Sequence, residues 1–355
     1  MSTTSKSPRT VAVVALDVGT WTLPTYSHRC SRKDYTLPQL FACLVLRKFF
    51  KTDYRGIAAI VADWRDLRET LGLTKTPHFT TFQKVEKKLL RNQQVRAMLT
   101  RCAEIYYGLA PPDEQTPREA QPITLTAADS TGFALDRASR YFVRRRAHGQ
   151  KHAANPLYQS TTYRRFGKLG IVIDCDSHLI LASHRGMGPK PDVNQLLPML
   201  EAISENVIPE CMLLDAGYDS QDNHELLREY LNVESWIPPT HGRPSARLPT
   251  GKWRWLMATQ FDEGRYGQRW QCETAMFMIK QRQGAALTAR KYQTRRREMG
   301  LMCVVHNIMI IYVWGGFLQG SNDPFSALNS IDRSGLNGLD SWGGALQWGE
   351  KHSAA

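Results

Sequence analysis

The chain has 355 residues and a formal net charge of +13, from 46 Lys and Arg against 33 Asp and Glu. This excess favours a polyanionic partner, either nucleic acid or an acidic membrane surface. Membrane insertion is not expected, because the most apolar run, residues 304–318, is too short to span a bilayer. Seven scattered cysteines without a C-x-x-C pair argue against a disulfide framework or zinc site and favour a reducing cytoplasm. Nucleic acid is therefore the favoured partner.

Residues 1–33 are predicted to form an N-terminal extension that is partly disordered, above all over its first ten residues. Residues 34–110 are predicted to be a helical domain. Within it, T-L-P-Q at 36–39 is typical of a capping box with a proline in the first turn, and an apolar run follows. Thr52 is expected to cap the next helix.

Two further segments of this region predict a helix, a turn and a second helix: L-R-E-T-L-G-L, then T-K-T-P-H, then T-T-F-Q-K-V-E-K-K-L-L. Thr80 and Gln83 are expected to form a second capping box at the start of the later helix. The pair is either a DNA-reading helix-turn-helix or an ordinary helical hairpin, and the residues alone leave both open. Residues 111–122, rich in proline, predict a linker.

Beyond the linker the hydrophobic pattern changes to that of strands. Strands are predicted at 123–130, as a hairpin at 169–184, at 211–215 and at V-E-S-W-I-P-P. Helices are predicted after Asp192, after the A-G-Y-D turn, over the signature segment 266–280 and from about Glu298 to Trp314. This order predicts an α/β catalytic core with a mixed sheet over 123–318. A short, irregular, basic insertion is expected at about 241–264, and a flexible tail at 319–355.

Two predicted strands end in a carboxylate, at Asp129 and Asp215, and a later helix carries Glu273. Ligands bind at the carboxyl ends of strands in α/β sheets. Three oxygen donors from separate elements suit Mg²⁺ or Mn²⁺. Two such ions ~3.5–4 Å apart activate the attacking oxygen and stabilise the leaving oxygen in phosphoryl transfer. Taken singly, each aspartate is as well explained by a structural turn.

Residues 266–280 predict a helix with two neighbouring stripes. At ~100° per residue, a polar stripe only ~60° wide contains Tyr266, Arg269, Glu273 and Lys280. The stripe beside it is apolar and is expected to be buried: Cys272, Ala275, Met276 and Ile279. The charges of the polar stripe alone favour an incidental solvated face over a functional one.

The spacing Tyr266-x2-Arg269-x3-Glu273-x6-Lys280 resembles the signature of a large group of bacterial insertion-sequence transposases. These are DDE enzymes with an RNase H-like core. Their first two acids end the first and fourth core strands, which matches T-L-T-A-A-D and C-M-L-L-D here. The N-terminal helices resemble the family less specifically, and the whole resemblance spans roughly residues 35–315. In one departure, only 57 residues, 216–272, separate the second and third acids, so the large β-strand insertion of some members is absent or much reduced.

The resemblance implies a DNA transposase that cuts at the ends of its insertion sequence and joins the 3′-OH to target DNA. Its catalytic and metal-binding residues would be Asp129, Asp215 and Glu273, with Mg²⁺ as the cofactor and Mn²⁺ as a substitute. The other polar-stripe residues would hold the DNA backbone. The implied partners are double-stranded DNA, both terminal inverted repeats and target, and a second copy of the chain or more. The implied location is the cytoplasm, at the nucleoid.

Residues 136–168 contain nine basic residues and one acid, with aromatic residues between them. They predict a DNA-tracking segment, with a solvated loop as the alternative. The DNA-binding candidates in this segment are Arg144, Arg145, Arg146, Arg164 and Arg165. Residues 295–297, three consecutive arginines, are expected to extend the basic surface. Trp253 and Trp255 are expected to pack in the core, with stacking on an unpaired base as the alternative.

Two other functions compete with transposition. One is a nuclease on the same core, which hydrolyses DNA without strand transfer. The other is a DNA-binding protein or repressor that has lost catalysis. The three acids argue against the second, because a pure binder gains nothing from an anionic cluster that faces phosphates. Asp219 is the first substitute if Asp215 is not a ligand.

Overall fold

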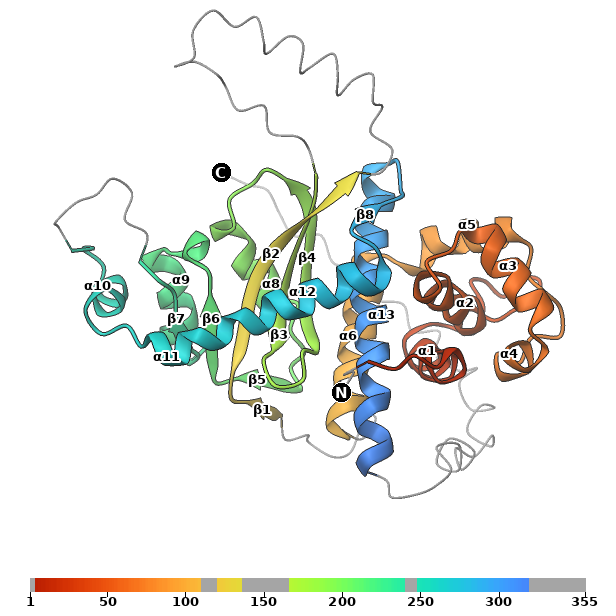
Figure 1. The fold of residues 1–355 in the computed structure, drawn as a ribbon, viewed down its shortest axis with the longest axis horizontal. Helices are drawn as coiled ribbons and strands as arrows, with labels where there is room; N and C mark the ends of the chain where they lie inside the picture. The colour runs from red at the N-terminus through yellow and green to blue at the C-terminus, as the bar shows by residue number, and fades with distance from the viewer. Residues whose placement is uncertain (1–3, 110–119, 136–165, 240–247, 319–355) are drawn as a thin grey trace, which may run out of the picture. The chain divides into compact units, whose positions relative to one another are not determined.

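The computed structural model describes residues 4–109, 120–135, 166–239 and 248–318, with side chains described as far as residue 311. Residues Met1–Gly315 form one compact unit. Its first third is helical (Figure 1), with α1 Pro8–Thr22, α2 Leu37–Phe49, α3 Tyr54–Asp63, α4 Arg65–Thr70, α5 Phe79–Leu89 and α6 Asn92–Tyr107.

The prediction of disorder over the first ten residues is wrong from residue 4 onward. The Ser7 side chain caps α1 by accepting from the backbone N–H of Thr10, and Pro8 stands in the first turn. The backbone N–H of Ser5 donates to the carbonyl of Met309 at 2.7 Å. One face of α1 is fully buried and packs against α2 and α6. Tertiary packing of this face, rather than helix propensity, explains why the helix forms.

The predicted capping box of α2 is confirmed. Thr36 Oγ1 accepts from the Gln39 N–H at 3.3 Å, and Gln39 Oε1 accepts from the Thr36 N–H at 2.9 Å. Gln39 also donates to the carbonyl of Gly72 at 2.8 Å, so the cap holds the turn after α4 as well.

The other two predicted caps are wrong. Asp53 and not Thr52 caps α3, because the helix begins at Tyr54 and the Asp53 carboxylate accepts from the Gly56 N–H at 2.7 Å. α5 begins one residue before Thr80, with His78 at its N-cap and no side-chain cap bond, so Thr80 and Gln83 lie inside the helix. The predicted helix, turn and helix are nevertheless present as α4, residues 71–78 and α5. Their role in reading DNA stays a prediction.

The second part of the unit is built on a mixed sheet, so the predicted α/β class is confirmed. The strand order is β4-β3-β2-β6-β7, and β8 pairs with β2. β2 runs antiparallel to β3, and β3 to β4, whereas β2–β6 and β6–β7 are parallel pairs. A separate pair joins β1 to β5. The strands are β1 Gln121–Ile123, β2 Thr126–Leu135, β3 Phe166–Asp174, β4 Ile180–Gly188, β5 Val207–Pro209, β6 Cys211–Leu214, β7 Glu234–Trp236 and β8 Ala286–Leu287.

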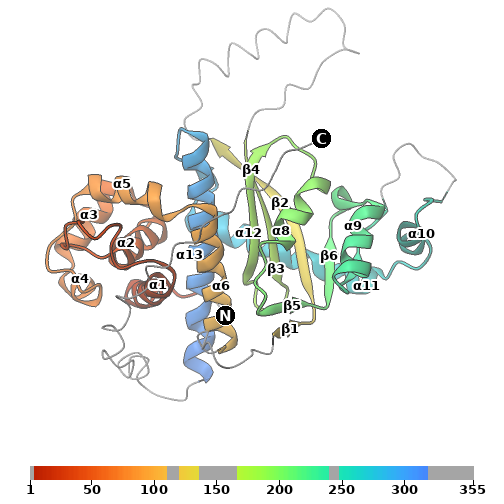
Figure 2. The ribbon, with the colours of Figure 1, turned by 180° about the vertical axis from the view of Figure 1, so that it is seen from behind.

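Both faces of the sheet are covered. On one face, Ala127, Ile171 and Leu213 belong to the core that includes residues of α12 (Trp270–Gln283) and α13 (Tyr292–Leu318). On the other face, Ala128, Val172 and Leu214 pack with α8 (Leu196–Leu200) and Tyr218. Figure 1 shows α12 crossing in front of the strands, and Figure 2 shows α8 on the opposite side. The sides alternate along each strand as the pleat requires.

β2 differs from its prediction in the way that matters most for the site. It does not end at Asp129 but continues to Leu135, because Phe133 is fully buried and the strand keeps its pairing with β3 up to that residue. The parallel pairing with β6 stops earlier, at Ala128 opposite Leu214. Asp129 therefore lies where two parallel strands separate, inside a strand rather than at its end.

The region between β7 and α12 is also more regular than expected. Within 241–264, residues 240–247 lie outside the described part, but Lys252–Thr259 forms α10 and Glu263–Tyr266 forms α11. The predicted linker falls mostly on residues 110–119, which are not described, and its last residues belong to β1. The remaining helical elements of the described residues are α9 Gln221–Glu225, a π-helical turn Leu226–Tyr230 and three 3-10 turns: Val193–Gln195, Ala216–Tyr218 and Gly267–Arg269. None of the described helices is long and apolar enough to cross a membrane.

Candidate active site

Asp129 and Asp215 occupy corresponding positions on adjacent strands. Ala128 and Leu214 are the last register partners of β2 and β6, and each acid is the next residue along. Neighbouring strands are ~4.8 Å apart, so the parallel register brings the two backbones close together. Burial raises the pKa of Asp129, and the charge of Asp215 adds to this against the lowering effects of the Ser130 N–H and Arg269. The two acids thus interact unfavourably when both are ionised.

Arg269 joins Asp129 to the third acid. Its Nη1 lies 2.9 Å from Asp129 Oδ2, and its Nη2 lies 2.5 Å from Glu273 Oε1. Arg269 ends a 3-10 turn that connects α11 to α12, and Glu273 follows one helical turn later. Burial lowers the pKa of the Arg269 guanidinium, but Asp129, Tyr266 and Glu273 outweigh this and raise it. Arg269 is therefore a permanent cation between two carboxylates.

The predicted helix over 266–280 is interrupted: Tyr266 ends α11, a 3-10 turn follows, and Lys280 lies on α12. Both side chains nevertheless contact the sheet. The Tyr266 hydroxyl donates to the carbonyl of Leu214 at 3.2 Å, directly before Asp215. Burial raises the pKa of Tyr266 to about 12, so the phenol is protonated at neutral pH. Lys280 Nζ donates to Thr131 Oγ1 at 2.6 Å, two residues after Asp129. Burial lowers the pKa of Lys280.

The polar stripe thus faces the strands, and a merely solvated face does not describe it. Within the ion pair of this stripe, the Glu273 side chain is 58% exposed and the Arg269 side chain 18% exposed. The apolar stripe is buried as predicted, at Cys272, Ala275, Met276 and Ile279. The contact of Thr131 with Lys280 was not predicted from the sequence, because S-T-G after Asp129 is typical of a turn.

The three acids do not form one metal-binding cluster in this structure. Among the residues described, no three His, Cys, Asp or Glu side chains are placed together to hold a metal ion. Asp129 and Asp215 are adjacent, whereas Glu273 reaches Asp129 only through Arg269. The donor set nevertheless suits a divalent cation, because Asp129, Asp215 and Glu273 supply carboxylate oxygens, the ligands that Mg²⁺ prefers.

The spare carboxylates of the core are engaged elsewhere. Asp219, fully buried, accepts from Arg254 Nε at 2.9 Å and from Arg254 Nη2 at 2.7 Å. Asp174, the last residue of β3, accepts from the Tyr107 hydroxyl at 3.0 Å and from the Ser177 hydroxyl at 2.5 Å. Asp219 is therefore a poor substitute for Asp215 as a metal ligand.

Several predicted DNA contacts lie outside the described residues: Arg144, Arg145, Arg146, Arg164 and Arg165. The prediction of core packing is wrong for Trp255, whose side chain is 46% exposed on α10. Trp253 is partly buried, and its Nε1 donates to Glu229 at 2.7 Å. The cations of Arg228 and Lys252 lie over its ring.

The comparison with known families agrees with this geometry. Residues 120–308, 189 of the 355, match the family of transposase DDE domains, which act on DNA and generally use a divalent metal ion. The match begins at β1, ends within α13 and includes all three acids. A comparison with curated proteins gives no match. The mixed sheet with its covering helices is the RNase H-like core of such enzymes, and the chain belongs to the insertion-sequence DDE transposases.

Proposed function

We propose that the protein cuts DNA at the ends of its insertion sequence and transfers the resulting 3′-OH into target DNA. The observation that supports this best is the pair Asp129 and Asp215 at the separation of β2 and β6. The helix that carries Glu273 lies against the same strands through Tyr266, Arg269 and Lys280. Acids from three separate elements thus lie near the point where β2 and β6 separate.

In this proposal, Asp129, Asp215 and Glu273 hold Mg²⁺, for which Mn²⁺ substitutes. When bound, the metal would activate the attacking oxygen and stabilise the leaving oxygen. Arg269 now contacts one oxygen of Asp129 and one of Glu273. It would have to give up either oxygen that became a metal ligand.

Arg269, once released, is close enough to the acids to bind a DNA phosphate beside the scissile one. A guanidinium binds phosphate oxygens through two parallel hydrogen bonds. Lys280 of α12 provides a second positive charge beside Thr131, which lies two residues after Asp129 on β2. Tyr266 provides a neutral hydrogen-bond donor. Such positioning of the phosphate backbone supplies most of the catalysis in phosphoryl transfer.

The proposed partners are double-stranded DNA and a second copy of the chain, because two transposon ends must be brought together. The basic segment 136–168 is proposed as the DNA track, and residues 34–110 as a domain for DNA binding or dimerisation. The protein is proposed to act at the nucleoid.

The test is an oligonucleotide duplex that carries the element's end, incubated with Mg²⁺, Mn²⁺ or Ca²⁺. The proteins are the wild type, Asp129→Ala, Asp215→Ala and Glu273→Ala. Each variant should lose cutting and joining while it still binds the duplex. Mg²⁺ and Mn²⁺ should support catalysis, and Ca²⁺ binding alone, because Ca²⁺ is larger and less strict in geometry.

Glu263→Ala is the matched control, since it removes an exposed acid from α11 without touching the site. A variant of one of the three acids that still cuts at the wild-type rate would remove that acid from the ligand set. Cutting without joining by the wild type would instead favour the nuclease, and binding without cutting under any metal would favour the repressor.

A further inference from the structure

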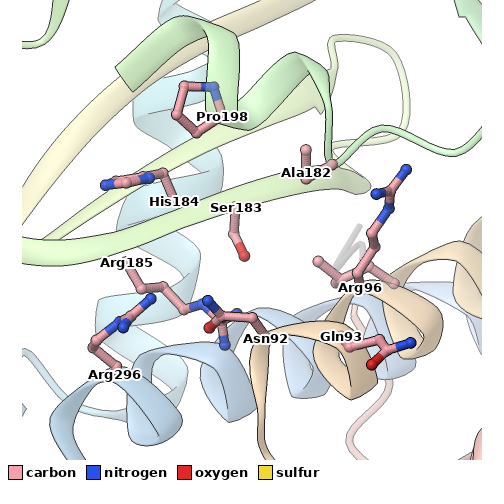
Figure 3. A pocket seen from close by; sticks show the side chains of 11 residues that line it. Asn92, Gln93, Arg96, Ala182, Ser183, His184, Arg185, Pro198 and Arg296 are labelled. Atoms are coloured by element: carbon pink, nitrogen blue, oxygen red, sulfur yellow. The ribbon is translucent and has the colours of Figure 1, made fainter. Parts of the chain in front are cut away.

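A cavity of about 390 Å³ lies at the edge of the sheet formed by β4, away from the three acids (Figure 3). It is lined by residues of β4, by the first turns of α6, by α8 and by Arg296 of α13. Three arginines contribute to its wall, Arg96, Arg185 and Arg296, together with His184. No described acid lines it.

The most buried of these cations is Arg185, whose relative exposure is 6%. Its Nη2 donates to Asn92 Oδ1 at 3.0 Å, while its Nη1 is buried without a hydrogen-bond partner. The Nε of Arg296 is also buried and unpartnered. Within the described part of the chain, none of the three arginines forms an ion pair with a carboxylate. Burial lowers the pKa of Arg185 to about 10, so it remains charged at neutral pH.

Other groups add to the positive potential. α6 is a helix of 16 residues whose N-cap, Arg91, makes no side-chain cap bond, and its first residues Asn92 and Gln93 line the cavity. The N-terminal end of a helix carries partial positive charge and free N–H groups. Burial lowers the pKa of His184, and the nearby cations Arg296, Arg185, Lys190 and Lys168 lower it further. Four cations thus lie close enough to His184 to act on its pKa in the same direction as burial.

A buried cation without a counter-ion is costly, and the usual remedy is an anionic ligand. We propose that this cavity binds a phosphate group, taken either from a DNA backbone or from free phosphate in solution. Guanidinium groups and a helix N-terminus are the donors that phosphate oxygens prefer.

Strand register separates this cavity from the proposed active site. Asp129, Ile171 and Ser183 are successive partners across β2, β3 and β4, so Ser183 lies ~10 Å across the sheet from Asp129. Ile171 between them is fully buried. The phosphate in the cavity is therefore not one that Lys280 or Arg269 reaches, and its binding does not depend on the proposed cleavage.

The first experiment measures thermal unfolding of the full chain with inorganic phosphate against chloride at equal ionic strength. Phosphate should raise the Tm of the wild type, because a ligand that binds only the folded state stabilises it. Arg96→Gln and Arg296→Gln, and Arg185→Met if it folds, should lose this rise. Arg29→Gln, which removes an exposed arginine before α2, and Asp129→Ala should keep it.

The second experiment distinguishes the source of the phosphate by the salt dependence of duplex binding. If the phosphate belongs to DNA, Arg96→Gln and Arg296→Gln should each make the slope of log K against log salt shallower by about 0.9. An unchanged slope with a lost phosphate response identifies free phosphate as the ligand. An equal rise in Tm for the wild type and the cavity variants, or no rise together with unchanged slopes, would overturn the proposal.

Discussion

The pKa values of two carboxylates, the buried Glu298 and the half-buried Asp129, are shifted in opposite directions by their surroundings. Burial alone would raise the pKa of Glu298 on α13, but Lys48 and the donors of Thr288 and Ala289 lower it below its usual range. Burial also acts on Asp129, and there the charge of Asp215 helps to raise the pKa despite Arg269. The neighbours of Glu298 thus outweigh the effect of burial on its pKa, whereas those of Asp129 do not. A carboxylate whose pKa is raised in this way is typical of a functional site.

The largest expected effect concerns Glu298. Lys48→Met leaves Glu298 buried without its cation, 2.8 Å from where the ammonium was, and should lower the free energy of unfolding by about 3–5 kcal/mol. Chemical denaturation measures it. Lys75→Met is the control, because Lys75 is exposed and its loss should change stability by less than about 0.5 kcal/mol. Equal effects of the two substitutions would show that Glu298 does not need Lys48.

Substitutions around Asp129 should change the rate of end cleavage rather than the stability of the protein. Arg269→Ala and Lys280→Ala should each slow end cleavage about a hundredfold, the usual consequence of a phosphate misplaced by ~1 Å. Their melting temperatures should stay close to that of the wild type. Arg290→Ala removes an exposed arginine beyond α12 and should cut normally. Wild-type strand-transfer rates in both variants would mean that these cations serve only the fold.

A third substitution tests whether Arg269 stands where a metal would act. Arg269→Ala frees the oxygens of Asp129 and Glu273, so Mn²⁺ should bind the DNA-free protein more tightly. Removing one positive charge ~4 Å away is worth at least about 1 kcal/mol even in water, or about fivefold in affinity. Calorimetric titration with Mn²⁺ measures it. Weaker Mn²⁺ binding in this variant would indicate that Arg269 organises the acids instead of competing for them.

The smallest effect is the pH dependence, which should have opposite signs for the two acids. The raised pKa of Asp129 means that its ionised form costs stability above that pKa, and that this cost disappears as pH falls through it. Asp129→Asn should therefore be slightly more stable than the wild type at pH 7 and equal to it in acid. The lowered pKa of Glu298 contributes stability at neutral pH that is lost only as pH falls below 4.5. Melting curves of Asp129→Asn and the wild type between pH 3 and pH 7 measure this difference. A variant less stable than the wild type at pH 7 would contradict the prediction.

Much of the fold follows from local sequence. The capping box of α2, the β3–β4 hairpin and the buried stripe of α12 all depend on patterns within a dozen residues. Local patterns failed where tertiary packing decides. β2 continues beyond Asp129 because Phe133 finds a place in the core, and α1 forms because its small apolar face packs on α2.

The candidate site was predictable only in part for the same reason. The spacing of Tyr266, Arg269, Glu273 and Lys280 marked the helix, but nothing local indicated that Arg269 pairs with Asp129, 140 residues earlier. The arginine cavity had no sequence signal at all, since Arg96, Arg185 and Arg296 come from three distant elements. Such clusters follow from topology, which single-sequence patterns do not specify.

The bond between Lys48 and Glu298 spans 250 residues of chain, and the first residues reach still further, from Ser5 to Met309. Ribosomes add about 5–20 residues per second, so tens of seconds separate the synthesis of Lys48 from that of its partner. Through that interval the nascent helices α1 and α2 lack the helix that completes their core. The order of translation therefore leaves the N-terminal third accessible to chaperones and other ligands until α13 emerges.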